Sequence, residues 1–168
     1  MDKQNYAHKC KLAAQGIRKN IESKLYIEDK EILKGTLEGK IPEQYLDGSI
    51  VDALNYFSSP QDQISKAVLN TINEHLRFQQ NPPAFRIGLL SETAKDNLFI
   101  NLRMAIGLKK LRMKLRAKQI MDKIISRSYN SGFALPEYYL NNRPEGKGPM
   151  VGRGAANIIL YYNEKSGE

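Results

Sequence analysis

Basic side chains crowd an apolar segment in the second half of the chain. Residues 98–127 contain nine Lys or Arg and a single acid, Asp122, among regularly spaced aliphatic residues. Guanidinium and ammonium groups bind phosphate through charge-assisted hydrogen bonds, and each phosphate that they neutralise releases a counterion. The chemistry that these residue types predict is binding to a polyanion, and nucleic acid is the first candidate.

A helical projection of residues 98–127 gives two apolar stripes and two basic rows, as expected for a helix that packs against two neighbours. Like charges at i,i+4 repel one another, so such a row is easiest to explain when an anion lies across it. The apolar stripes are Met104, Leu108, Leu111 and Leu115, and Leu102, Ile106, Met113, Ala117, Ile120 and Ile124. The first basic row is Arg103, Lys110, Lys114 and Lys118. The opposite row is Lys109, Arg112, Arg116, Lys123 and Arg127. We expect the first row to bind phosphates without reading bases, and the second to do the same or to meet a neighbouring subunit.

Two other interpretations of these cations stay open. They can simply solvate an exposed helix, or the acids of residues 22–52 can dock onto them. The uneven charge argues against both, because residues 1–90 hold twelve Lys or Arg and eleven acids, whereas residues 91–168 hold fourteen and seven. A net charge of +8 also favours an acidic partner.

A second basic segment lies in the tail. Residues 141–154 contain four Gly and two Pro, which predicts a mobile loop that orders only against a partner. Glycine lets backbone N–H groups approach phosphate closely, so Arg143, Lys147 and Arg153 are further candidate contacts. A P-loop is excluded, because no Gly-Lys is followed by Ser or Thr. Paired tyrosines on either side could stack on bases, although core or interface positions are more usual for them: Tyr138, Tyr139, Tyr161 and Tyr162.

The residues needed for common catalytic sites are sparse. His8 and His75 are the only histidines and Cys10 is the only cysteine, and no pair has the spacing of a zinc site. Carboxylates are scattered, with no pair suited to acid–base or two-metal chemistry. We therefore expect no enzyme, no metal and no cofactor, and a metal-independent nuclease is the catalytic alternative that stays open.

Periodicity predicts an all-α fold, a helical bundle around one long basic helix, followed by an irregular Gly/Pro-rich C-terminal extension. The long helix should run from Ser91 to about Tyr129, with Gly107 and the pair Asp96–Asn97 as weak points. Shorter helices are expected over residues 3–25, over 28–38 and from Ser59 to about Gln80. We assign residues 1–140 to a helical bundle domain and 141–168 to a Gly/Pro-rich loop and a short C-terminal element. Residues 155–165 fit a helix or a strand, and we favour the helix.

The first ten residues lack the apolar segment of a signal peptide, and no stretch is long and apolar enough to span a membrane. These features predict a cytoplasmic protein without a membrane partner.

In size, helical content and the basic segment 101–127, residues 1–130 resemble the small subunits of CRISPR effector complexes. That resemblance implies a helical, non-catalytic subunit that binds RNA or single-stranded DNA by its backbone within a ribonucleoprotein assembly. Its partners would be nucleic acid, other protein subunits and further copies of itself. The alternative is a structural or scaffold protein of a phage or organelle assembly whose basic helix docks onto an acidic protein. A helix-turn-helix regulator ranks last, because no short turn is followed by a polar recognition helix.

Overall fold

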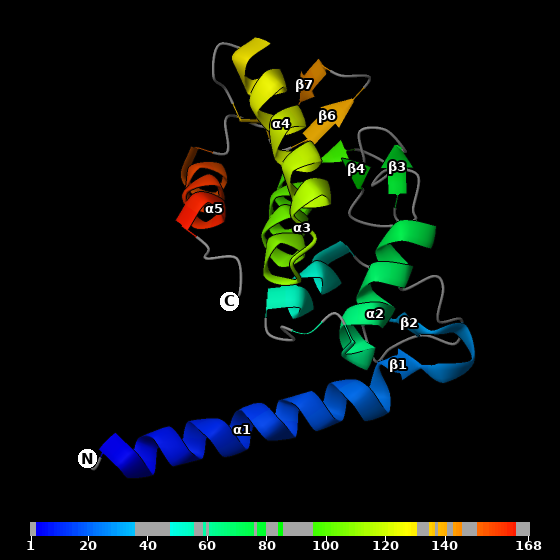
Figure 1. Ribbon diagram of the computed structural model, residues 1–168, viewed down its shortest axis with the longest axis vertical. Coiled ribbons are helices and arrows are strands. Elements are labelled where there is room, and N and C mark those ends of the chain that lie inside the picture. Colours follow the sequence, from blue (N-terminus) through cyan, green and yellow to red (C-terminus); the bar gives the residue numbers. More distant parts are fainter. Residues whose placement is uncertain are drawn as a thin grey trace.

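The computed structural model describes residues 3–35, 48–55, 59, 61–75, 77–79, 84–85, 96–130, 135–136, 138–140, 143–145 and 151–163. Its longer elements are all helices, which confirms the predicted all-α class (Figure 1). The α-helices are α1 (Lys3–Lys24), α2 (Gln63–Asn70), α3 (Leu98–Lys110), α4 (Lys114–Asn130) and α5 (Val151–Asn163). Two 3₁₀ helices, η1 (Glu28–Lys30) and η3 (Gly48–Asn55), and a π-helix, η4 (Thr71–His75), are also described.

The strands are two or three residues long and join helices rather than form a layer of their own. They are β1 (Tyr26–Ile27), β2 (Ile32–Leu33), β3 (Arg77–Gln79), β4 (Ala84–Phe85), β5 (Asp96–Asn97), β6 (Tyr138–Leu140) and β7 (Arg143–Glu145). β1 pairs with β2 and β3 with β4, while β6 lies between β5 and β7; all four pairings are antiparallel.

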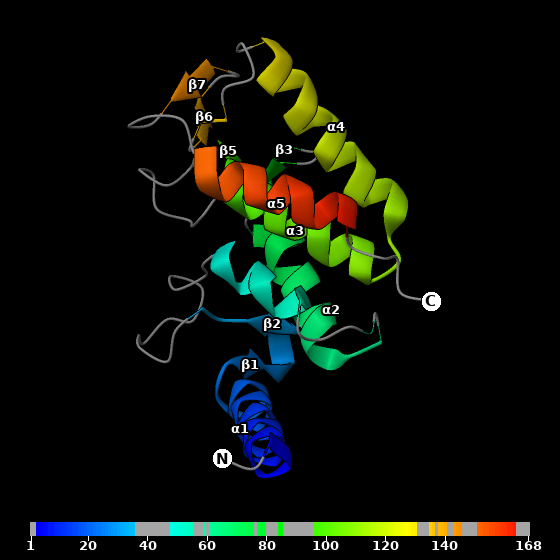
Figure 2. The ribbon, with the colours of Figure 1, turned by 90° about the vertical axis from the view of Figure 1, so that its left-hand side faces the viewer.

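Helix α3 lies at the centre of the core, and α4, α5 and η3 pack against it (Figures 1 and 2). Nine of its thirteen residues are buried, as expected for an interior helix. Eight of the ten residues in the two predicted apolar stripes are buried. Met113 is half-buried and Leu115 is exposed, so that part of the prediction is wrong.

Those two residues lie at a break that divides the predicted long helix into α3 and α4. Arg112 has a φ of 62°, in the left-handed region. Its backbone N–H donates to the carbonyl of Lys109, and the N–H of Met113 donates to the carbonyl of Leu108. These two bonds form a Schellman motif, which ends a helix by satisfying its last carbonyls. The position that glycine usually occupies in this motif is held here by arginine, so the sequence carries no mark of the break.

Replacing Arg112 with glycine should raise the free energy of unfolding by about 1 kcal/mol, because an L side chain in the left-handed region is strained. Urea unfolding followed by circular dichroism measures the change. Arg112→Ala is the control, since it removes the same charge and keeps the strain. Equal stabilisation by both substitutions would show that charge, not backbone conformation, limits stability at this turn.

Several other predicted boundaries are wrong for local reasons. Residues 28–33 of the helix expected over 28–38 belong instead to the β1–η1–β2 hairpin, in which Glu31 has a φ of 49°. Residues 36–38 lie outside the described part of the chain. The helix expected from Ser59 begins after Asp62, whose carboxylate caps the backbone N–H of Ile64 at 2.9 Å. Asp96 and Asn97, expected inside a helix, form β5, and Asn97 caps α3 by accepting from the N–H of Ile100.

The tail is more regular than predicted. Residues 143–145 form β7 by pairing with β6, and α5 begins at Val151, so a continuous irregular loop over 141–154 is wrong. The hydrogen bonds between β7 and β6 stabilise residues 143–145 as a strand despite the glycines and prolines around them. The helix favoured for residues 155–165 is confirmed through Asn163. The division of the chain at residue 140 stays a prediction, although β6–β7 pairing and the packing of α5 on α3 both cross it.

Candidate nucleic-acid interface

The first predicted row does not lie on one helix face, because the break at Arg112 puts half of it on each helix. Arg103 and Lys110 lie on α3, whereas Lys114 and Lys118 lie on α4. Arg103 forms an ion pair with Asp52 of η3, and Lys110 donates to the carbonyl of Asn55 at 3.3 Å. The interpretation that acids of residues 22–52 dock onto this segment therefore holds at Arg103. Lys114 and Lys118 are exposed, and Lys118 pairs with Asp122 at 2.5 Å.

Most cations of the opposite row contact other side chains or the backbone within the protein. The carboxylate of Asp96 accepts from Lys123 Nζ at 3.0 Å and from Arg127 Nη1. The three side chains are 4%, 7% and 15% exposed, respectively, so this is a buried ion triad. The other oxygen of Asp96 accepts from the side-chain amide of Asn101 at 2.9 Å. Asp96 therefore ties β5 to α4 through the triad and to α3 through Asn101.

Burial within this triad lowers the pKa of the Lys123 ammonium, and attraction to Asp96 opposes that shift. The guanidinium of Arg127 also lies over the ring of Tyr139, 4.6 Å from its centroid. Burial raises the pKa of Tyr139, whose hydroxyl has no hydrogen-bond partner in the described part of the chain. These cations hold the core together and are not presented to a ligand.

Two further cations of the opposite row serve packing. Arg116 donates to the side chain of Asn73 at 2.8 Å, and burial, then repulsion from Arg77, lowers its pKa. Lys109 donates to the backbone carbonyl of Tyr161 at 2.6 Å, and its ammonium also lies over the aromatic ring of Tyr161. These two contacts hold α5 against α3. Arg112 alone in this row is exposed.

The tail candidates are distributed over different elements. Arg143 belongs to β7 and Arg153 to the first turn of α5, but their side chains lie outside the described part of the structure, as does the whole of Lys147. Of the four tyrosines, Tyr139 and Tyr161 are buried in the core, Tyr138 is half-buried and Tyr162 is exposed.

Among the elements whose side chains the structure describes, α1 is the most basic exposed one, and none of its residues was predicted to bind. Its twenty-two residues include one acid, Glu22, and no residue of this fully described helix is buried. Figure 1 shows it reaching away from the body of the protein, which it meets near β1. Its basic residues are Lys3, Lys9, Lys11, Arg18, Lys19 and Lys24. A charge count over this window would have found the helix, whereas the count over residues 1–90 averaged it with the acids that follow.

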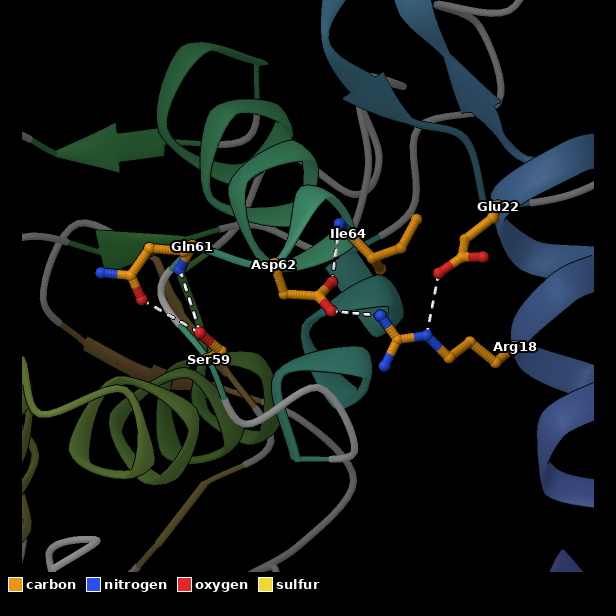
Figure 3. A network of polar contacts seen from close by, with 6 residues as sticks. All are labelled: Arg18, Glu22, Ser59, Gln61, Asp62 and Ile64. Atoms are coloured by element: carbon orange, nitrogen blue, oxygen red, sulfur yellow. Dashed lines mark hydrogen bonds and ion pairs between the residues drawn. The ribbon is translucent and has the colours of Figure 1, made fainter.

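One arginine fixes the direction of α1. Arg18 donates to Glu22 at 2.8 Å on the same helix and forms an ion pair with Asp62, the residue that caps α2 (Figure 3). Ile21 and Leu25 pack against the core beside this contact. The helix is therefore held at its C-terminal end, and its exposed cations Lys9, Lys11 and Lys19 form no ion pair among the described residues.

Within the described ranges, every helix is too short or too polar to cross a lipid bilayer. The same residues bring together no three His, Cys, Asp or Glu side chains that could hold a metal ion. No protein-family model, curated protein or solved structure matches this chain.

Proposed function

We propose that this protein is a non-catalytic subunit that binds the backbone of RNA or single-stranded DNA independently of sequence, with α1 as the principal contact. The observation that carries the proposal is an exposed helix with six basic side chains and one acid. Such a helix is about 33 Å long at 1.5 Å per residue, so it can follow several successive phosphates. The proposed setting is a ribonucleoprotein assembly of the CRISPR small-subunit type.

The test is a salt titration of binding to a labelled single strand. Removing one lysine–phosphate interaction should reduce the slope of log affinity against log salt by about 0.7. Around α1, Lys19 lies between Lys9 and Lys11, which are about 160° apart. Replacing all three with Gln should therefore reduce the slope by about 1.4 when the strand follows one side of the helix and reaches Lys19 and one of the other two, and by about 2 when it wraps around the helix. The same change should occur with unrelated sequences, because backbone contacts carry no base information.

The comparison variant removes three exposed lysines from other helices, by replacing Lys66, Lys114 and Lys118 with Gln. Lys114 and Lys118 belong to the first predicted row, so this variant compares that row with α1 and should retain most of the salt dependence. An equal reduction in both triple variants would mean that α1 is not the principal contact. Unchanged binding in the α1 variant would overturn the proposal.

A scaffold role is the second candidate, and the exposed apolar residues of α1 favour it. Tyr6, Leu12 and Ile17 are all exposed, although phosphate binding requires none of them. An acidic amphipathic helix on a partner protein could cover Ile17 and neutralise the lysines beside it. Ile17→Ser separates the two candidates, since it should leave binding to nucleic acid unchanged and weaken binding to such a partner.

A further inference from the structure

Two arginines meet at one neutral side chain where η4, β3 and α4 come together. Arg116 Nη2 donates to Asn73 Oδ1 at 2.8 Å, and Arg77 Nη2 donates to the same oxygen at a longer 3.4 Å. Because both groups donate to a single oxygen atom, the two guanidiniums are direct neighbours. All three side chains are half-buried, so the pair is partly shielded from water but still reachable from solvent.

The charge of Arg116 is not compensated in the way that Asp96 compensates Lys123, two turns further along the same face of α4. Arg116 has the amide of Asn73 instead, and it forms no ion pair with the residues that the structure describes. Burial lowers the pKa of Arg116, and repulsion from Arg77 lowers it further. A half-buried cation with a like charge beside it destabilises the fold unless an anion is bound there.

We propose that Arg77 and Arg116 form a binding site for one phosphate group, with Asn73 holding the two guanidiniums in place. A guanidinium donates two parallel hydrogen bonds to an oxyanion, so a carboxylate is satisfied by a single arginine. A phosphate carries oxygens in more than one plane and can accept from two arginines on different elements. This site lies on other elements than α1 and does not depend on the role proposed for that helix.

Inorganic phosphate is the probe, because it tests the site without nucleic acid. The full chain is melted in phosphate from about 0.1 to about 50 mM, with sodium chloride keeping the ionic strength constant. A site with two arginines should bind with a dissociation constant of roughly 1 mM, which raises Tm by roughly 5 °C at the highest concentration. Failure of this titration would leave the proposed role of α1 untouched, since that role is tested with a labelled strand.

Arg116→Gln should bind phosphate at least tenfold more weakly and lose most of this rise in Tm, and Arg77→Gln should do the same. Without phosphate, Arg116→Gln should melt no lower than the unaltered chain, because it removes a half-buried charge from beside another. A purely structural role for Arg116 predicts the opposite pattern, a lower Tm in every buffer and an unaltered chain that does not respond to phosphate.

Lys114→Gln is the matched control, since it removes one positive charge from an exposed position on the same helix. Phosphate also stabilises folded proteins by being excluded from their surfaces, and that effect should be the same in every variant. Equal responses in Arg116→Gln and the unaltered chain would overturn the proposal. So would equal losses in Arg116→Gln and Lys114→Gln, or a response no larger than that to sodium chloride.

Free phosphate and the phosphates of a bound strand are two sources of the same group. If the site holds a strand phosphate, Arg116→Gln should weaken binding of a labelled single strand several-fold, and inorganic phosphate should compete with the strand. If the site holds free phosphate, the variant should lose the rise in Tm and keep its affinity for the strand. Weaker strand binding in a chain whose Tm never responds to phosphate would overturn the proposal, because net charge alone would then explain the loss.

Discussion

Asp96→Asn should lower the free energy of unfolding by about 3–5 kcal/mol, the largest effect that we expect from a single substitution in this protein. Asparagine keeps the size of the side chain but removes its negative charge. Lys123 and Arg127 would then be buried without a counter-charge, and the link between β5 and α4 would weaken. The free energy of unfolding of a small domain is only about 5–15 kcal/mol, so urea denaturation should detect this loss readily.

The matched control is Asp122→Asn, which makes the same change in the exposed pair with Lys118. Exposed ion pairs contribute little to stability, so this variant should unfold almost like the unaltered protein. Similar losses of stability in the two variants would contradict the assignment of Asp96 as the centre of a buried triad.

The loss in free energy of unfolding caused by Asp96→Asn, which we call the deficit, should depend on pH. Burial already holds the pKa of Lys123 below its ordinary value, and removing Asp96 takes away the attraction that opposes this shift. A lysine whose pKa is lower in the folded state binds more protons when unfolded, so stability rises with pH. The deficit should therefore narrow between about pH 7 and about pH 10. A deficit that widens over this range would show that the pH dependence does not come from the lowered pKa of Lys123.

Gly107→Ala should lower the free energy of unfolding by about 1–3 kcal/mol, although alanine is the better helix former. A Cβ at this position would lie 2.6 Å from the Cβ of Leu54 and 3.0 Å from its Cδ1. The nearest atom is close to the backbone of η3 and cannot swing aside, so η3 and α3 would have to separate. Thermal and urea unfolding should both show the loss of stability.

The control is Gly16→Ala, in α1, where an added Cβ meets nothing within 4 Å. Without a clash, only helix propensity changes, and α1 should gain about 1 kcal/mol of helix stability. Leu54→Gly in the Gly107→Ala protein provides a second check, because removing the Cβ of Leu54 relieves the clash and should make the two effects on stability less than additive. Strict additivity would mean that the two residues are not in contact.

The candidate site was harder to predict from the sequence than the fold. Counting lysines and arginines over residues 98–127 correctly found a dense basic segment, but not which of its charges face solvent. Arg103 is neutralised by Asp52, fifty-one residues away, and Arg127 by Asp96, thirty-one residues away. Pairings at such separations depend on how helices pack. Helix α1 was overlooked as well, because its charge was averaged with that of the acidic residues after it.

Local periodicity by itself determined that the chain is mainly helical and that a helix covers nearly all of residues 3–25, which the structure confirms as α1. Those features depend on neighbours three or four residues apart, which a sequence displays directly. The tertiary structure alone decided that the long basic segment turns back at Arg112, that Gly107 is needed against Leu54 and that most central cations are paired. The physical reason is that helix reversal, close packing and charge burial are settled by contacts between distant residues, whose energies outweigh local propensity.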